Sequence, residues 1–135
     1  MNSHTALNAI LRTDFKLFYQ RSFAELNPAI DYQDNWHMDA IIHVLNGVIN
    51  GDIRRLIINM PPRYGKSLAT TVALTAYLLG LDPSKRIITA CYAHSLAETL
   101  SLECRRLMAA PFSCTAFPDL KIGEGKNAVT HFETT

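Results

Sequence analysis

The sequence has little net charge, few cysteines and no long apolar run. Its formal net charge is +1 over 135 residues, so no bulk basic field argues for nucleic-acid binding, although a local basic face stays open. The three cysteines, Cys91, Cys104 and Cys114, are odd in number and lack metal-type spacing. We therefore expect unpaired thiols in a reducing compartment, packed as small buried hydrophobic side chains, instead of a disulfide framework.

Membrane segments are also missing from the pattern. The N-terminus has no apolar signal core, and the most apolar stretch, Leu68 to Leu81, contains three threonines and is too short to cross a bilayer. We expect a cytoplasmic protein with no membrane partner. Because 48% of the residues are apolar, the chain can bury the core of about one domain.

What the sequence does contain is an apolar run followed by a tight turn and a long helical pattern. Leu56 to Ile58 predicts a short buried strand, and the turn ends in Gly65-Lys66-Ser67. Gly65 lets the backbone approach a phosphate, and the N–H groups that open the next helix point at the anion. Lys66 would reach the β and γ phosphates, and the Ser67 hydroxyl would bind the accompanying Mg²⁺. The sequence therefore predicts a phosphate loop for ATP and Mg²⁺.

This loop departs from the pattern G-x-x-x-x-G-K-[ST]. Met60 stands at the first glycine position, and Pro61 and Pro62 stiffen the entry. Gly-Lys-Ser alone is more often an ordinary helix start. The strand before it and the helix after it favour the phosphate loop.

The rest of the chain alternates helical patterns with a second apolar run, Ile87 to Cys91. Helices are predicted from Thr5 to Leu26, from an N-cap at Asp34 to a terminator at Gly51, from Lys66 to Leu79 before Gly80, and from Ser95, which has capping-box spacing to Glu98. Two successive β-α units predict an α/β fold with a right-handed parallel sheet flanked by helices. We divide the chain into a helical lead, 1–34, and the N-terminal part of a phosphate-loop ATPase domain, 35–135.

The acidic half of an ATPase site is missing from this pattern. ATP hydrolysis needs carboxylates at the end of another buried strand to hold Mg²⁺ and to position water. No aspartate follows an apolar strand, and Glu124 and Glu133 lie in or beside a weak third strand, Ala128 to Phe132. An average sheet has about five or six strands, so the parallel core looks incomplete. We expect the chain to be the N-terminal part of a larger enzyme.

Between about Asn35 and Leu107 the sequence resembles the large terminase subunit of tailed bacteriophages. The resemblance rests on Trp36-His37 at a helix start, on the run Gly51 to Met60, on Pro-Pro-Arg-Tyr-Gly-Lys-Ser at 61–67, and on Ala-Cys-Tyr-Ala-His-Ser-Leu-Ala at 90–97. In that family an N-terminal RecA-like P-loop ATPase drives viral DNA into the capsid, and a C-terminal nuclease cuts the DNA. The resemblance also explains why the first glycine of the loop is missing.

The resemblance implies a set of nucleotide-binding loop residues: Pro62, Arg63, Tyr64, Gly65, Lys66 and Ser67. It implies catalytic roles for Lys66 and for Arg63, whose guanidinium would neutralise charge on the transferred phosphoryl group. Without the family, Arg63 is equally well a solvated loop charge.

Two further segments have open interpretations. The resemblance assigns Gln33, Trp36 and His37 to the adenine side of the site, whereas Trp36 is equally well a hydrophobic staple of its helix. Tyr92, His94 and Ser95 follow the second strand, where related translocases touch DNA, whereas His94 is also explained as a plain loop residue before a helix.

The resemblance thus implies the ATP-binding part of a subunit that couples ATP hydrolysis to translocation of double-stranded viral DNA. Its partners would be a portal protein, a small terminase subunit and further copies of the chain in a motor, at the procapsid in the host cytoplasm. The alternatives are a helicase-like nucleic-acid translocase and a non-catalytic prophage remnant.

Overall fold

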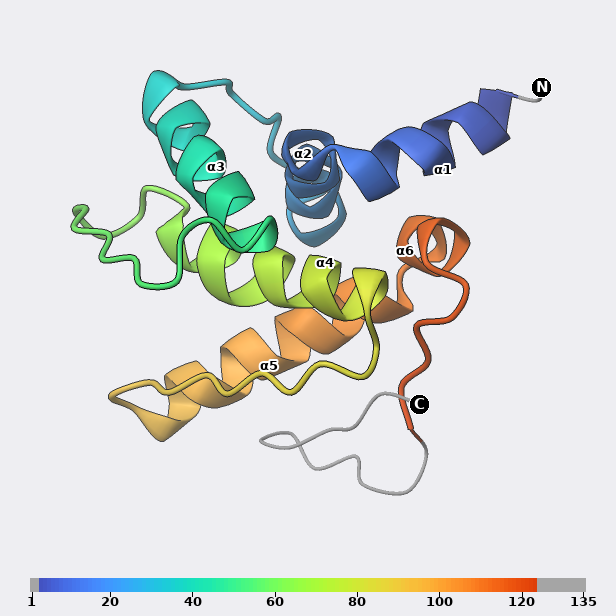
Figure 1. The fold of residues 1–135 in the computed structure, drawn as a ribbon. Helices are drawn as coiled ribbons and strands as arrows, with labels where there is room; N and C mark the ends of the chain where they lie inside the picture. The colour runs from blue at the N-terminus through green and yellow to red at the C-terminus, as the bar shows by residue number, and fades with distance from the viewer. Residues whose placement is uncertain (1–2, 124–135) are drawn as a thin grey trace.

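The computed structural model of the chain describes residues 3–123. Its elements are all helical: α1 (Ser3–Thr13), α2 (Phe15–Leu26), α3 (Trp36–Ile49), η1 (Leu68–Ala73), α4 (Leu74–Leu81), α5 (His94–Ala109) and α6 (Pro111–Ala116) (Figure 1). Element η1 is a π-helix that runs directly into α4, so the two form one continuous rod.

The predicted α/β fold, with its RecA-like parallel sheet, is wrong for residues 3–123, because these residues form no strand and no sheet. The two apolar runs lie in irregular segments, 55–61 and 85–91. Their central side chains, Ile57 and Ile88, are 86% and 95% exposed. The third predicted strand, Ala128 to Phe132, lies outside the described residues.

The physical reason is that an apolar run predicts burial but does not supply a partner. A strand becomes part of a sheet only when a second backbone lies about 4.8 Å away with its N–H and C=O groups in register. Here the segments 55–61 and 85–91 lie on opposite sides of an open groove, to which both contribute lining side chains. Neither segment therefore has the neighbour that a parallel ladder requires.

The core instead surrounds the rod formed by η1 and α4, which lies between α3 and α5 (Figure 1). Small side chains dominate the rod: Ala69, Val72, Ala73 and Ala76 are all fully buried. Small residues let neighbouring helices approach closely, and the Cys104 thiol of α5 lies 3.8 Å from the Val72 carbonyl oxygen. This packing gives α5 a buried face of Leu100, Cys104, Leu107 and Met108, as its apolar spacing predicts.

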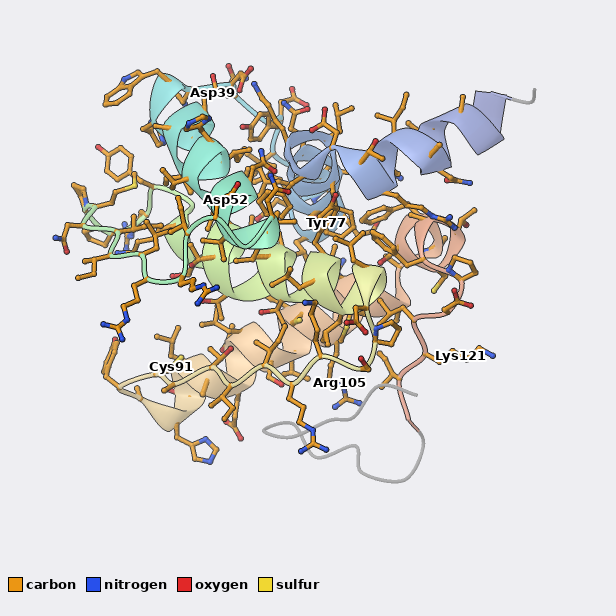
Figure 2. The ribbon with its side chains drawn as sticks, in the orientation of Figure 1. Asp39, Asp52, Tyr77, Cys91, Arg105 and Lys121 are labelled. Carbon is orange, nitrogen blue, oxygen red and sulfur yellow. The ribbon has the colours of Figure 1, made fainter. Side chains whose placement is uncertain are left out.

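Tyr77 connects the rod to the first two helices. It points from α4 toward α2 (Figure 2), and its ring lies 5.2 Å from the rings of both Phe15 and Phe18. Its hydroxyl donates a hydrogen bond to the carbonyl oxygen of Arg12 at 2.7 Å. The helical lead therefore packs into the same core as the rod.

Several predicted helix boundaries are wrong. The single leading helix is in fact two, because Asp14 lies in extended backbone between α1 and α2 and its carboxylate accepts a hydrogen bond from the N–H of Leu17 at 3.1 Å. The N-cap of α3 is Asn35, one residue after the predicted Asp34. Helix α5 begins at His94 without a side-chain cap, so the predicted capping box of Ser95 is also wrong.

Asp34 has a different role from the predicted cap. Its carboxylate lies 3.1 Å from the ammonium group of Lys16, which also lies 2.6 Å from the carboxylate of Asp39. These two carboxylates raise the pKa of Lys16 above its ordinary value. The ion pairs tie α2 to the first turn of α3.

The other expectations have mixed outcomes. Helix α3 runs through Asn46-Gly47, and Gly51 follows it with φ +84°, as predicted. Cys104 is buried, whereas Cys91 is half-buried and Cys114 is exposed. None of the described helices is long and apolar enough to cross a membrane.

Candidate functional site

The loop between Met60 and Ser67 turns sharply and delivers Lys66 and Ser67 to the start of a helix. Two residues in the turn have left-handed backbone, Arg63 with φ +68° and Gly65 with φ +76°. The N–H of Ala69 donates to the carbonyl oxygen of Gly65 at 3.0 Å, which closes the first helical turn. The N–H groups ahead of Ala69 therefore precede the first intrahelical bond and are suited to bind an anion.

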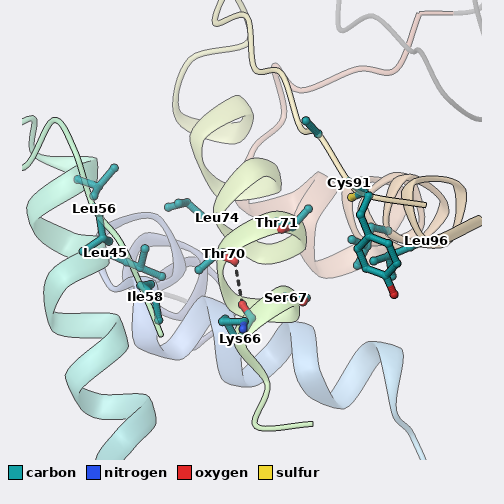
Figure 3. A pocket seen from close by; sticks show the side chains of 14 residues that line it. Leu45, Leu56, Ile58, Lys66, Ser67, Thr70, Thr71, Leu74, Cys91 and Leu96 are labelled. Atoms are coloured by element: carbon teal, nitrogen blue, oxygen red, sulfur yellow. Dashed lines mark hydrogen bonds between the residues drawn. The ribbon is translucent and has the colours of Figure 1, made fainter. Parts of the chain in front are cut away.

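Lys66 and Ser67 differ in how they are held. Lys66 is half-buried, and its ammonium group donates to the carbonyl oxygen of Met60 at 3.3 Å, across the loop. Ser67 is exposed, and the hydroxyl of Thr70 donates to the carbonyl oxygen of Lys66 at 2.9 Å (Figure 3). A positive charge and an exposed hydroxyl thus stand side by side at a helix N-terminus.

Gly65 rests on two buried side chains from the helical lead and α3. A Cβ added to Gly65 would lie 3.0 Å from the hydroxyl oxygen of Tyr19 and 3.6 Å from the sulfur of Met38. Tyr19 is 2% exposed and Met38 is 4% exposed. A side chain at position 65 would therefore crowd the Tyr19 hydroxyl and would stand in an unfavourable backbone conformation.

An aromatic group lies beside the loop. The ring of Tyr64 is 5.5 Å from the ring of His37, and His37 is 6.1 Å from Trp36, both in edge-on geometry. Trp36 is 81% exposed, so it does not pack as a hydrophobic staple of α3. The structure thus brings the predicted adenine-side residues Trp36 and His37 to the loop through Tyr64.

Gln33, Pro62 and Arg63 are also exposed. Gln33 precedes the aromatic group, and its carbonyl oxygen accepts a hydrogen bond from the side-chain amide of Asn35 at 3.4 Å. Arg63 lies in the turn with left-handed backbone and an exposed side chain. All nine predicted nucleotide-binding residues accordingly lie in the loop 62–67 or in the segment 33–37 at the start of α3.

An open groove of about 510 Å³ runs from the loop to the second apolar segment. Figure 3 shows Leu56 and Ile58 on one side, Cys91 and Leu96 on the other, and Ser67 of the loop and Thr71 of the rod between them. Lys66 lines one end of this groove. The groove wall is mostly apolar, so the polar groups that could bind a phosphate are concentrated at the loop.

The residues that the resemblance links to DNA lie at the groove and in the first turn of α5. Tyr92 is 95% exposed and lines the groove edge. The Nδ1 atom of His94 lies 3.7 Å from a carboxylate oxygen of Glu98, one turn along α5. His94 and Ser95 are both exposed in the first turn of α5.

Carboxylates do not gather at the loop. Within residues 3–123 there is no group of three or more His, Cys, Asp or Glu side chains that could hold a metal ion. Mg²⁺ prefers oxygen ligands and keeps several waters, so Ser67 fits as one ligand beside the phosphates of a nucleotide. The described residues fit nucleotide-associated Mg²⁺ better than a metal held by protein alone.

Three features of the site were not predicted from the sequence. Tyr19 and Met38 lie 46 and 27 positions before Gly65, and only their place in buried helical stripes distinguishes them. The contact between Tyr64 and His37 has no local signal. The π-helix η1 directly after Ser67 has none either, although such helices are frequent at functional sites.

Comparison of the chain with protein-family models, with curated proteins and with solved structures gives no match.

Proposed function

We propose that this chain binds the phosphates of ATP, together with Mg²⁺, at the loop 62–67. The observation that carries the proposal is the left-handed pair Arg63 and Gly65, which turns the backbone so that Lys66 and Ser67 open a helix. A positive side chain, an exposed hydroxyl and helix-opening N–H groups then converge on one small region. That combination suits a polyphosphate better than it suits a neutral ligand.

Binding would change the partner of one side chain. Lys66 now donates to the carbonyl oxygen of Met60, which is a neutral acceptor. A phosphate oxygen is charged and forms a stronger hydrogen bond with an ammonium group. We therefore expect Lys66 to leave Met60 and to bind the β and γ phosphates, while Ser67 supplies one oxygen to Mg²⁺.

The exposed aromatic group would receive the base. Trp36 presents 81% of its surface to solvent, and Tyr64 links it through His37 to the phosphate loop. Stacking on an aromatic ring tolerates any base, so the amide of Gln33 would provide the preference for adenine. The exposed guanidinium of Arg63 would neutralise charge that develops on the terminal phosphate.

We further propose that this site serves viral DNA packaging, as part of a large terminase subunit. Support comes from the Pro-Pro-Arg-Tyr-Gly-Lys-Ser loop and the Trp36-His37 helix start that the family shares. In that role the chain would act in the host cytoplasm with double-stranded DNA, a portal protein and a small terminase subunit. Tyr92, which lines the groove and is 95% exposed, would be available for DNA contact.

Equilibrium binding of a fluorescent ATP analogue with Mg²⁺ tests the nucleotide proposal, with hydrolysis followed in the same samples. Wild type should bind saturably, and Lys66→Ala should weaken binding by about tenfold or more, because a charge-assisted bond to phosphate is lost. Lys121→Ala is the matched control, since Lys121 is an exposed lysine far from the loop (Figure 2). Equal affinities for wild type and Lys66→Ala would exclude the loop as a phosphate site.

A second candidate function is that of a non-catalytic chain that associates with partners through apolar surface. The exposed Ile57 and Ile88 favour it, because both lie in extended segments without a paired strand within residues 3–123, and an unpaired extended segment with apolar side chains can pair with another chain. Sizing chromatography separates the two: a monomer that binds the ATP analogue supports the phosphate site, and a large assembly without binding supports association.

A further inference from the structure

The buried hydroxyl of Tyr19 lies directly beneath the phosphate loop. Tyr19 belongs to α2 and is 2% exposed, and its oxygen would stand 3.0 Å from a Cβ at Gly65. The sulfur of Met38, from α3, completes the same contact surface at 3.6 Å. Two helices that precede the loop in the sequence therefore support its most constrained residue.

This hydroxyl contributes little to the core through hydrogen bonding. Its hydrogen-bond acceptor is the sulfur of Met38 at 4.0 Å, and a thioether is a weak acceptor. The ring itself packs edge-on against Tyr32, with centroids 5.9 Å apart. Packing of the ring therefore explains why an aromatic residue stands here, but it does not explain the oxygen.

We infer that Tyr19 is a positioning residue for the phosphate loop: its hydroxyl fixes the distance between the backbone of Gly65 and helix α2. This inference rests on the proposed function, because the position of the Gly65 backbone is important for function only if the N–H groups that follow it bind a phosphate. The outer residues of the loop, Pro62 to Tyr64, are exposed, and Tyr64 contacts His37. At Gly65 itself the neighbouring side chains are those of Tyr19 and Met38. Loss of the oxygen would open a gap under Gly65 and let the loop settle inward.

Tyr19→Phe separates this role from a role in stability. Replacing a buried, poorly paired hydroxyl by hydrogen is nearly neutral or stabilising for a fold. We therefore expect an unchanged or higher melting temperature together with about threefold weaker binding of the fluorescent ATP analogue, because a displaced loop presents its N–H groups less well. A purely structural residue would move both quantities in the same direction.

A double-mutant cycle with Gly65→Ala tests the contact itself. In wild type, Gly65→Ala should weaken binding by about tenfold or more, since left-handed backbone and a clash with the Tyr19 oxygen both oppose the new methyl group. In the Tyr19→Phe background the clash is relieved, and the loss should be smaller, because only the backbone term remains. Tyr77→Phe is the control background, because its buried hydroxyl bonds Arg12 and not the loop; there the full loss should remain.

The outcomes separate the inference from the proposed function. Binding that is absent in wild type, or unchanged in Lys66→Ala, overturns both. Binding that depends on Lys66 while Gly65→Ala costs the same in all three backgrounds overturns the role of Tyr19 alone. A reduced cost in Tyr19→Phe only, with an undiminished melting temperature, establishes it.

Discussion

The ring of Phe117 lies against the backbone of Gly80, so closely that a Cβ on Gly80 would come within 2.6 Å of two ring carbons. Phe117 is 3% exposed, and its ring also contacts Phe18 and Tyr77, at centroid distances of 5.7 and 5.8 Å. The ring is therefore enclosed on several sides. Gly80 lies inside α4, not beyond its end, and its role is close packing.

Gly80→Ala should consequently destabilise the protein. An alanine in a helix interior gains up to about 1 kcal/mol of helix propensity over glycine, but overpacking a filled core costs about 1–3 kcal/mol. Since the Phe117 ring has no room to move, we expect a net loss of about 1–2 kcal/mol in the free energy of unfolding. Urea denaturation followed by circular dichroism measures it.

Gly47→Ala provides the matched comparison, because Gly47 is also a glycine inside a helix. A Cβ there would meet the Cδ1 and Cγ1 atoms of Ile53 at 2.7 and 3.0 Å, and both atoms belong to the outer part of a flexible side chain. Rotation of Ile53 removes the clash, so the substitution should be neutral or stabilising by up to about 1 kcal/mol. Equal losses at positions 47 and 80 would contradict the packing argument.

The contrast between these glycines shows where sequence reasoning succeeds. The apolar spacing of α3 and α5 predicts their buried faces correctly, because the period of a helix is a local property. The run through Asn46-Gly47 is predicted for the same reason. The prediction that Gly80 ends its helix is wrong. Glycine is needed there because the ring of Phe117, 37 positions later in the sequence, packs against its backbone.

The prediction of two strands is wrong for a related reason. The segments 56–58 and 87–91 have the composition of buried parallel strands, but composition does not tell whether a neighbouring strand is present. In residues 3–123 each of these segments is only partly buried, and Ile57 and Ile88 are exposed. The loop after the first run is correctly predicted as a turn into a helix, because Gly65-Lys66-Ser67 is a local signal.

Arg63 allows a test that separates backbone strain from charge. Its φ of +68° is unfavourable for a residue with a side chain, by about 1–2 kcal/mol, whereas glycine adopts it readily. Arg63→Gly should therefore raise the free energy of unfolding by up to about 1 kcal/mol after the entropy of glycine is counted. It should also weaken binding of the ATP analogue, since the guanidinium is lost.

Arg63→Ala supplies the control, because it removes the guanidinium and keeps the unfavourable backbone conformation. Both variants should bind the ATP analogue with similarly reduced affinity, and only Arg63→Gly should be more stable than wild type. If both bind as tightly as wild type, Arg63 is a solvated loop charge in the nucleotide-bound state as well. Thermal unfolding and fluorescence titration of the same samples give both quantities.

Asp14 fixes the break between α1 and α2. Its carboxylate accepts a hydrogen bond from the N–H of Leu17 at 3.1 Å, at the start of α2. Asp14→Ala should lower the free energy of unfolding by about 1 kcal/mol, whereas Asp14→Asn, which keeps a capping oxygen, should lose only a few tenths. Chemical denaturation compares the two. Losses of the same size would show that the cap does not stabilise this junction.

Alkaline pH should destabilise the fold through buried acidic groups. Burial raises the pKa of the Cys104 thiol to about 12 and that of the Tyr19 hydroxyl to about 12. The folded chain therefore keeps protons that the unfolded chain releases, from about pH 8.5 for cysteine and about pH 10 for tyrosine. Stability is fully present below these values and falls as pH rises toward the folded-state pKa.

Between about pH 7 and about pH 9.5 the cysteine dominates the loss of stability, so Cys104→Ala should flatten the fall in urea midpoint over that range. Cys114→Ala, at an exposed position, should leave it unchanged, and an equal slope in all three proteins would show that Cys104 does not carry the effect.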